Sequence, residues 1–226
     1  MSNWWSDRAS WPVWNTNSPS SDPEKVDKIV SEFMTKTDSM TLDVGGTMLG
    51  FIRYLPATAP HDLEQRIRLV NKKGKKRIYR RNMGAVPESD RYNLIMSFGT
   101  LMYMGKKEIR FTFEKAHRLL APGGTILISD MDGGNFWVWV ELAMKWVAKL
   151  IFWGLPWRAH SKKAIVAMMR QAGFEITDRP DLQPSRGGLL AAISSMRYYV
   201  VAGVKPATLS PHHRLPMDPS VAGSSA

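Results

Sequence analysis

Residues 41–50, TLDVGGTMLG, are the first stretch whose residue types could do chemistry. An apolar run ends at Asp43, and Gly45 and Gly46 follow. Glycine has no Cβ, so backbone N–H groups in such a turn can come close to a ligand, while the carboxylate can fix the turn or reach the ligand. The glycines do not have the spacing of the common phosphate and dinucleotide motifs. The stretch is either an irregular cofactor turn or a tight loop that binds nothing.

Several other kinds of chemistry are excluded by composition. The chain has no cysteine, which rules out disulfides, thiolate metal sites and a thiol nucleophile, and favours the cytoplasm. No histidine spacing is typical of a zinc site, and His212 and His213 lie in a Pro- and Ser-rich tail. We therefore expect no metal site.

The elements that must position the turn alternate between strand and helix. Helical periodicity is present around 22–34, 50–55, 106–120, 136–153 and 161–172, with Ser21 or Asp22 as the first cap. Short apolar runs predict strands at 40–44, 66–70, 77–82, 92–98, 125–130, 174–177 and 197–204. This order predicts a doubly wound, mostly parallel seven-stranded α/β sheet, whose ligands bind beyond the carboxyl ends of the strands.

The 226 residues, 44% hydrophobic, suffice for one core. We expect a Trp-rich N-terminal arm at 1–21, one domain at 22–205 and a disordered tail at 206–226. The first residues do not have the pattern of a secretory signal.

Residues 92–132, YNLIMSFGTLMYMGKKEIRFTFEKAHRLLAPGGTILISDMD, resemble the second half of class I S-adenosylmethionine-dependent methyltransferases. The most specific part is the turn Pro122-Gly123-Gly124 before a β-branched strand. MMRQAGFEITD (168–178) is similar to a later helix and strand of that family. The resemblance covers about residues 24–205 and implies a Rossmann-like methyltransferase fold with S-adenosylmethionine as cofactor.

The first motif of that family is D-x-G-x-G-x-G after a strand. Asp43 and Gly45 match it, the later glycine positions fall on Thr47 and Leu49, and a one-residue gap places Gly46 at the second glycine. The resemblance implies a cofactor site with these members: Asp43, Gly45, Gly46, Asn71, Asn82, Met83 and Ser97.

Three acidic positions of the family are amides in this alignment. The second strand usually ends in a carboxylate for the ribose hydroxyls; here Asn71 ends it if the strand is 66–70, although Asp62 has roughly the right spacing. Asn82 and Asn93 align with the other two. An amide lacks the charge-assisted strength of a carboxylate, so these positions predict weaker cofactor binding.

Residues 136–160 form an apolar segment where methyltransferases insert a helical cover. Glu141, Lys145 and Lys149 recur every four residues within it, so they share one narrow face, and three charges within about 18 residues argue against a membrane span. The segment could pack on the sheet and the Trp-rich arm, form a lid over a hydrophobic acceptor, or lie in a membrane surface. A lid containing Trp137, Trp139, Trp146 and Trp153 would suit an aromatic, polyketide or lipid-like acceptor.

Two side chains are candidates for the catalytic base that a hydroxyl acceptor would need. His160 ends the cover segment. Tyr103 follows the fourth strand, where the family that the chain resembles often has a histidine or tyrosine. A cap or surface position before Ser161 is the alternative for His160.

The net charge of +11 is concentrated in NKKGKKRIYRR, residues 71–81. This block could meet an anionic membrane surface or an acidic carrier protein, or be a solvated loop edge; nucleic acid is supported by charge alone. The leading hypothesis is a cytoplasmic, or peripherally membrane-bound, methyltransferase for a hydrophobic small molecule. The rival is a methyltransferase-like protein without transfer activity, either a cyclase independent of S-adenosylmethionine or a non-catalytic binding partner.

Overall fold

The computed structural model describes residues 19, 22–35, 39–45, 62, 66–71, 78–80, 83–136, 138–139, 158–183 and 198–207. Within these residues seven strands form one sheet in the order β3-β2-β1-β4-β5-β7-β6. They are β1 (Thr41–Val44), β2 (Ile67–Asn71), β3 (Ile78–Arg80), β4 (Tyr92–Phe98), β5 (Leu120–Met131), β6 (Glu175–Asp178) and β7 (Tyr198–Val204). The seven apolar runs of the sequence each contribute a strand, so the α/β prediction is confirmed.

The sheet is mostly parallel, as expected. Strands β3, β2, β1, β4 and β5 pair in parallel, while β7 is antiparallel to both β5 and β6. The strand order reverses direction between β1 and β4. In open α/β sheets ligands bind at the carboxyl edge next to such a reversal.

The Pro-Gly-Gly segment differs from the sequence prediction because it lies within β5 and not before it. Leu120 already pairs with Tyr92, and the register then shifts before Thr125 pairs with Leu94. Gly123 has a φ of +74°, and its N–H donates to the carbonyl oxygen of Lys205 (2.9 Å). The bulge is therefore held by the segment after β7, and the glycine permits its left-handed backbone.

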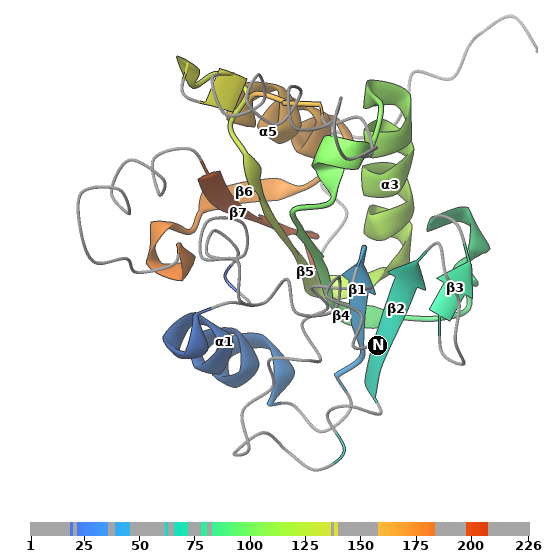
Figure 1. Cartoon of the computed structure of the whole chain (residues 1–226). Helices are drawn as coiled ribbons and strands as arrows, with labels where there is room; N and C mark the ends of the chain where they lie inside the picture. Colours follow the sequence, from blue (N-terminus) through green and yellow to red (C-terminus); the bar gives the residue numbers. More distant parts are fainter. Residues whose placement is uncertain are drawn as a thin grey trace, which may run out of the picture.

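Helices cover both faces of the sheet (Figure 1). On one face α3 (Lys106–Leu119) and α5 (Lys162–Gln171) bury a cluster that includes Leu42, Ile95, Phe113, Ile165 and Val201. On the other, α1 (Pro23–Ile29) and the π-helical turn η3 (Val30–Met34) bury a cluster that includes Ile29, Met34, Leu94, Met96 and Leu127. Asp22 caps α1 as predicted, since its Oδ1 accepts from the N–H of Glu24 (3.1 Å).

Three short 3₁₀ turns complete the described elements: η5 (Met83–Ala85), η6 (Leu101–Tyr103) and η7 (Pro180–Leu182). The predicted helix at 50–55 lies outside the described residues. So do nearly all of the N-terminal arm, most of the cover segment, most of the basic block at 71–81 and the tail beyond residue 207. In the described part of the chain, no helix is both long and apolar enough to cross a membrane.

Candidate functional site at the carboxyl edge of the sheet

The end of β1 places Asp43 and Gly45 beside the reversal in strand order. Asp43 is 4% exposed and stands between Leu69 of β2 and Met96 of β4. Gly45 follows the strand with a φ of +94°, a conformation that L side chains rarely adopt. The sequence prediction of a sharp glycine turn at this edge is confirmed; Gly46 lies outside the described residues.

Thr100 packs directly against that turn. Its Oγ1 donates to the carbonyl oxygen of Val44 (3.0 Å). A Cβ built on Gly45 would lie only 2.0 Å from that Oγ1 of Thr100. The missing side chain of Gly45 thus makes room for Thr100. The space on the Cβ side of this glycine is therefore filled by protein and is not a pocket.

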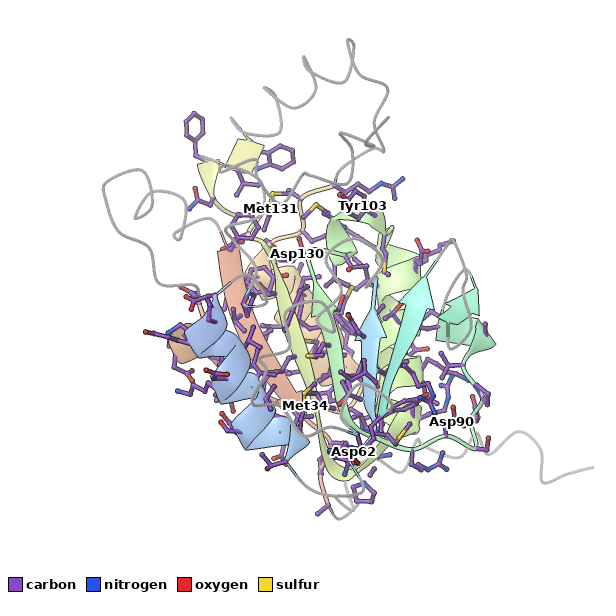
Figure 2. All side chains as sticks on the ribbon, turned by 60° about the horizontal axis from the view of Figure 1, so that its bottom comes forward. Met34, Asp62, Asp90, Tyr103, Asp130 and Met131 are labelled. Atoms are coloured by element: carbon purple, nitrogen blue, oxygen red, sulfur yellow. The ribbon has the colours of Figure 1, made fainter. Side chains whose placement is uncertain are left out.

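The end of β2 is Asn71, which pairs with Arg80 of β3. Asp62, the alternative from the sequence, lies before the strand and forms an ion pair with Arg66 (3.0 Å). Arg66 also donates to the carbonyl oxygen of Met34 (3.4 Å), and Figure 2 shows Asp62 and Met34 at the opposite end of the molecule from Tyr103 and Asp130. The carboxyl edge of β2 therefore ends in an amide residue.

The alignment placed two further amides, Asn82 and Asn93, at cofactor positions, and the structure does not support this for Asn93. Asn93 is the second residue of β4, and its Oδ1 accepts from the N–H of Met40 (3.2 Å), at the amino end of β1. It cannot contact a ligand at the carboxyl edge, so it says nothing about cofactor charge. Asn82 lies outside the described residues, and within them β3 ends at Arg80.

Two further predicted cofactor residues are buried. Met83 is 2% exposed and packs in the same cluster as Leu42 and Val44. Ser97, near the end of β4, is 1% exposed, and its hydroxyl has no hydrogen-bond partner among the described residues. A buried polar group without a partner is rare in folded proteins, so Ser97 is a better candidate for contact with a ligand than Met83.

The end of β5 brings in a carboxylate that the sequence analysis did not single out. Asp130 is 3% exposed; its Oδ2 accepts from the N–H of Met102 (3.2 Å) and its Oδ1 from that of Met131 (2.8 Å). It therefore holds η6 against β5. The signal was available, because Asp130 ends the apolar run TILISD (125–130) as Asp43 ends the apolar run MTLD (40–43).

The two predicted catalytic residues, His160 and Tyr103, lie at this same carboxyl edge of the sheet. His160 is 9% exposed, and its Nε2 lies 3.0 Å from the carbonyl oxygen of Met104, next to Tyr103. A carbonyl can only accept, so Nε2 carries the proton and Nδ1 of the neutral ring keeps a lone pair. Tyr103 is 42% exposed. His160 is thus neither a cap nor a surface residue, and the cap of α5 is Ser161, whose Oγ accepts from the N–H of Ala164 (3.3 Å).

The segment that carries His160 is fixed by backbone hydrogen bonds. The N–H of Gly133 donates to the carbonyl oxygen of His160 (3.0 Å), and that of Lys162 donates to Oδ1 of Asp132 (2.9 Å). These contacts join the end of β5 to the start of α5. They hold the backbone of His160 in place, and the bond from Nε2 to Met104 orients its ring.

A buried tyrosine adds to the electrostatics of this edge. Tyr199 of β7 pairs with Asp130 across the antiparallel ladder and is 3% exposed. Within the part of the chain that the structure describes, its hydroxyl has no hydrogen-bond partner. Burial raises the pKa of Tyr199 well above its ordinary value, and the negative charges of Asp130 and Asp132 raise it further. The phenol therefore stays protonated at this site.

No protein-family model matches the chain, and no curated protein matches its sequence. Solved structures match its fold. An O-methyltransferase family protein from Burkholderia thailandensis is 19% identical with a TM-score of 0.50, over 82% of this chain and 56% of that one. An S-adenosylmethionine-dependent methyltransferase from Mesorhizobium loti is 12% identical with a TM-score of 0.53, over 80% of this chain and 98% of that one.

A third match is a chain from a Haloferax volcanii complex that contains the Trm112 methyltransferase activator. It is 14% identical with a TM-score of 0.58, over 91% of this chain and 96% of that one. The present chain spans just over half of the Burkholderia protein and nearly all of the other two. It therefore has the fold of class I S-adenosylmethionine-dependent methyltransferases, as the resemblance implied.

Proposed function

We propose that the chain is an S-adenosylmethionine-dependent methyltransferase acting on a hydrophobic small-molecule or lipid-like acceptor. The observation that carries the proposal is the turn at Asp43 and Gly45, which lies at the carboxyl edge beside the strand-order reversal of a methyltransferase fold. Sheets of this kind bind their ligands at that point.

The residues at this edge fit the cofactor. The turn at Gly45 has the left-handed backbone that lets N–H groups face a ligand. The buried Ser97 hydroxyl has no hydrogen-bond partner within the described ranges, so it could bond to a ligand. Asp43 would orient the turn or the amino-acid portion of the cofactor, and Asn71 would contact the ribose. When bound, S-adenosylmethionine would supply a methyl group attached to a positively charged sulfur.

His160 is the base that the geometry favours. Its Nε2–H is held by the carbonyl oxygen of Met104, which leaves Nδ1 as the proton acceptor. A backbone carbonyl that fixes the tautomer in this way serves the same purpose as the orienting partner in other histidine sites. Tyr103, next to Met104, would position an acceptor hydroxyl toward that nitrogen.

An apolar acceptor is supported by the residues around His160 and Tyr103 at the carboxyl edge. Met102, Met131 and Val138 form a buried cluster with Ala159 and Tyr198 packed on it. An apolar environment with a few polar groups is typical of small-molecule sites, and it would help to exclude water from a displacement reaction.

Calorimetry with S-adenosylmethionine and with its demethylated product tests the proposal. We expect micromolar binding, which Asp43→Asn weakens at least tenfold while Asp27→Asn, on the exposed face of α1, leaves it unchanged. Thermal melting of both variants confirms that they fold. No detectable heat at millimolar ligand would contradict the proposal. Formation of the demethylated product with a panel of phenolic and lipid acceptors then identifies the acceptor class.

A second candidate is a methyltransferase-like protein without transfer activity, either a cyclase that does not use S-adenosylmethionine or a non-catalytic binding partner. It is favoured by Asn71 at the end of β2, where the family has a carboxylate, and by the contact between Thr100 and Gly45. The same titrations separate the two candidates. Absence of binding supports the second, and binding without turnover on any acceptor restricts it to a cofactor-binding protein.

A further inference from the structure

Large aromatic side chains are exposed at the carboxyl edge of the sheet. Phe136 is 71% exposed, Trp139 55% and Tyr103 42%. The segment that carries the first two is anchored, because Nε1 of Trp139 donates to the carbonyl oxygen of Gly133 (3.0 Å) and Val138 is fully buried. Tyr103 and Met131 lie at the same end of the molecule (Figure 2). Clustered exposed aromatics on a folded surface mark an interaction site.

Exposed cations lie at the same edge. Helices α3 and α5 run back from the ends of β4 and β5, so their first turns, with Lys106, Lys107 and Lys163, are at the carboxyl edge. Arg158 joins them: its N–H donates to the carbonyl oxygen of Met102 (2.7 Å), and its guanidinium lies 2.8 Å from where a Cβ on Gly105 would be. No carboxylate of the described residues pairs with these four side chains.

This charge pattern opposes the stability of the two helices. The amino end of a helix carries a partial positive charge, so acidic residues stabilise it and basic residues destabilise it. The first turn of α3 has Glu108 against two lysines, and the first turn of α5 has no acidic residue. Helix stability therefore does not account for the cations, whereas an anionic partner does.

We propose that this docking edge, made of Tyr103, Lys106, Lys107, Phe136, Trp139, Arg158 and Lys163, binds the surface of an anionic phospholipid bilayer. Aromatic side chains insert at the level of the headgroups, where Trp and Tyr are favoured, and the surrounding cations meet the negative surface potential. The inference goes beyond the proposed reaction and does not depend on it, because binding is measured without cofactor or acceptor.

Co-sedimentation of the full chain with vesicles tests the proposal. We expect binding to phosphatidylcholine vesicles with about 30% phosphatidylserine and much weaker binding to phosphatidylcholine alone, with a steep decrease at high salt. Lys163→Glu reverses one charge at the docking edge and should lower the partition coefficient roughly 30-fold. Trp139→Ala should weaken binding several-fold with no change in salt dependence.

The matched control is Arg170→Glu, which makes the same charge change at the other end of α5. The two positions are about 10 Å apart along the helix axis, beyond the screening length of physiological salt, so we expect a decrease of about threefold or less. Lys163→Glu places an acid at a helix amino end and does not weaken the fold, so its loss of binding is not due to unfolding.

Three outcomes would overturn the proposal. The first is equal binding to neutral and anionic vesicles, and the second is an equal effect of Lys163→Glu and Arg170→Glu. The third is salt-sensitive binding to single-stranded RNA by a chain that binds no vesicle, which would assign the docking edge to nucleic acid.

Discussion

The side chain of Thr100 occupies the space next to Gly45 that any other residue at position 45 would fill. Its hydroxyl donates to the carbonyl oxygen of Val44 (3.0 Å), so the end of β4 is tied to the end of β1 at the point where the strand order reverses. Position 45 therefore requires glycine twice, for a φ of +94° and for the contact with Thr100.

Gly45→Ala should accordingly destabilise the fold by roughly 2–4 kcal/mol, the sum of left-handed strain and steric overlap. Gly99→Ala is the control, because Gly99 also has a positive φ, of +62°, but its nearest atom to an added Cβ is 3.8 Å away. It should cost only about 1 kcal/mol. In a Thr100→Ala background the Gly45→Ala cost should shrink. Urea denaturation gives the free energy of unfolding of Gly45→Ala, Gly99→Ala, Thr100→Ala and the double variant at positions 45 and 100. Equal destabilisation by Gly45→Ala and Gly99→Ala would contradict the steric role of Thr100.

Asn71→Asp should strengthen binding of S-adenosylmethionine. A carboxylate at the end of β2 accepts charge-assisted hydrogen bonds from ribose hydroxyls, which are about twice as strong as neutral ones, so we expect a gain of about five- to tenfold. Asn93→Asp is the matched control at the amino end of β4, where the new side chain can still accept from the N–H of Met40. The affinity of the Asn93→Asp variant for S-adenosylmethionine should equal that of the wild type. A gain in affinity for Asn93→Asp, or no gain for Asn71→Asp, would argue against ribose binding at Asn71.

Strands were predictable because their signal is local. The run YNLIMSF, dense in apolar and aromatic residues between turn residues, gave β4 with its bounds, and the turn after Asp43 followed from two adjacent glycines. Contacts between distant segments were not predictable. The pairing of Thr100 with Gly45 and the role of Asp130 depend on register, and an alignment alone placed Asn93 near the cofactor although it lies at the amino end of its strand.

Tyr199→Phe should leave the fold as stable as before or stabilise it by up to about 1 kcal/mol, because no described residue hydrogen-bonds to the buried hydroxyl to compensate its loss of hydration. Burial, followed by the charges of Asp130 and Asp132, raises the pKa of Tyr199. An alkaline titration followed by ultraviolet absorption should therefore show the same number of tyrosines ionising before unfolding in the wild type and in the variant. On unfolding, the wild type should ionise one tyrosine more than the variant. A marked destabilisation of Tyr199→Phe would instead reveal a hydrogen bond to the hydroxyl.

Arg179 and its acidic partners should make stability depend on acid pH. Its guanidinium donates to Asp181 of η7 (2.8 Å) and to Glu32 of η3 (2.6 Å). Lys28 of α1 also contacts Asp181 (2.8 Å), which joins η7 to α1. The hydrogen bond from Arg179 lowers the pKa of Asp181 below its ordinary value, and Lys28 lowers it further. A carboxylate with a depressed folded-state pKa stabilises the fold above its unfolded pKa of about 4, and that contribution is lost as the pH falls further.

Asp181→Asn should therefore cost about 1 kcal/mol or less at pH 7, since the carboxylate is partly exposed and screened by solvent. The difference between wild type and variant should narrow as the pH is lowered from about 5 toward 3. Denaturation at a series of pH values measures it. Asp178→Asn, which breaks one exposed contact with Lys162, should have a smaller effect at pH 7. A difference for Asp181→Asn that stays constant down to acid pH would mean that packing, and not the charge next to Arg179, connects η7 to α1.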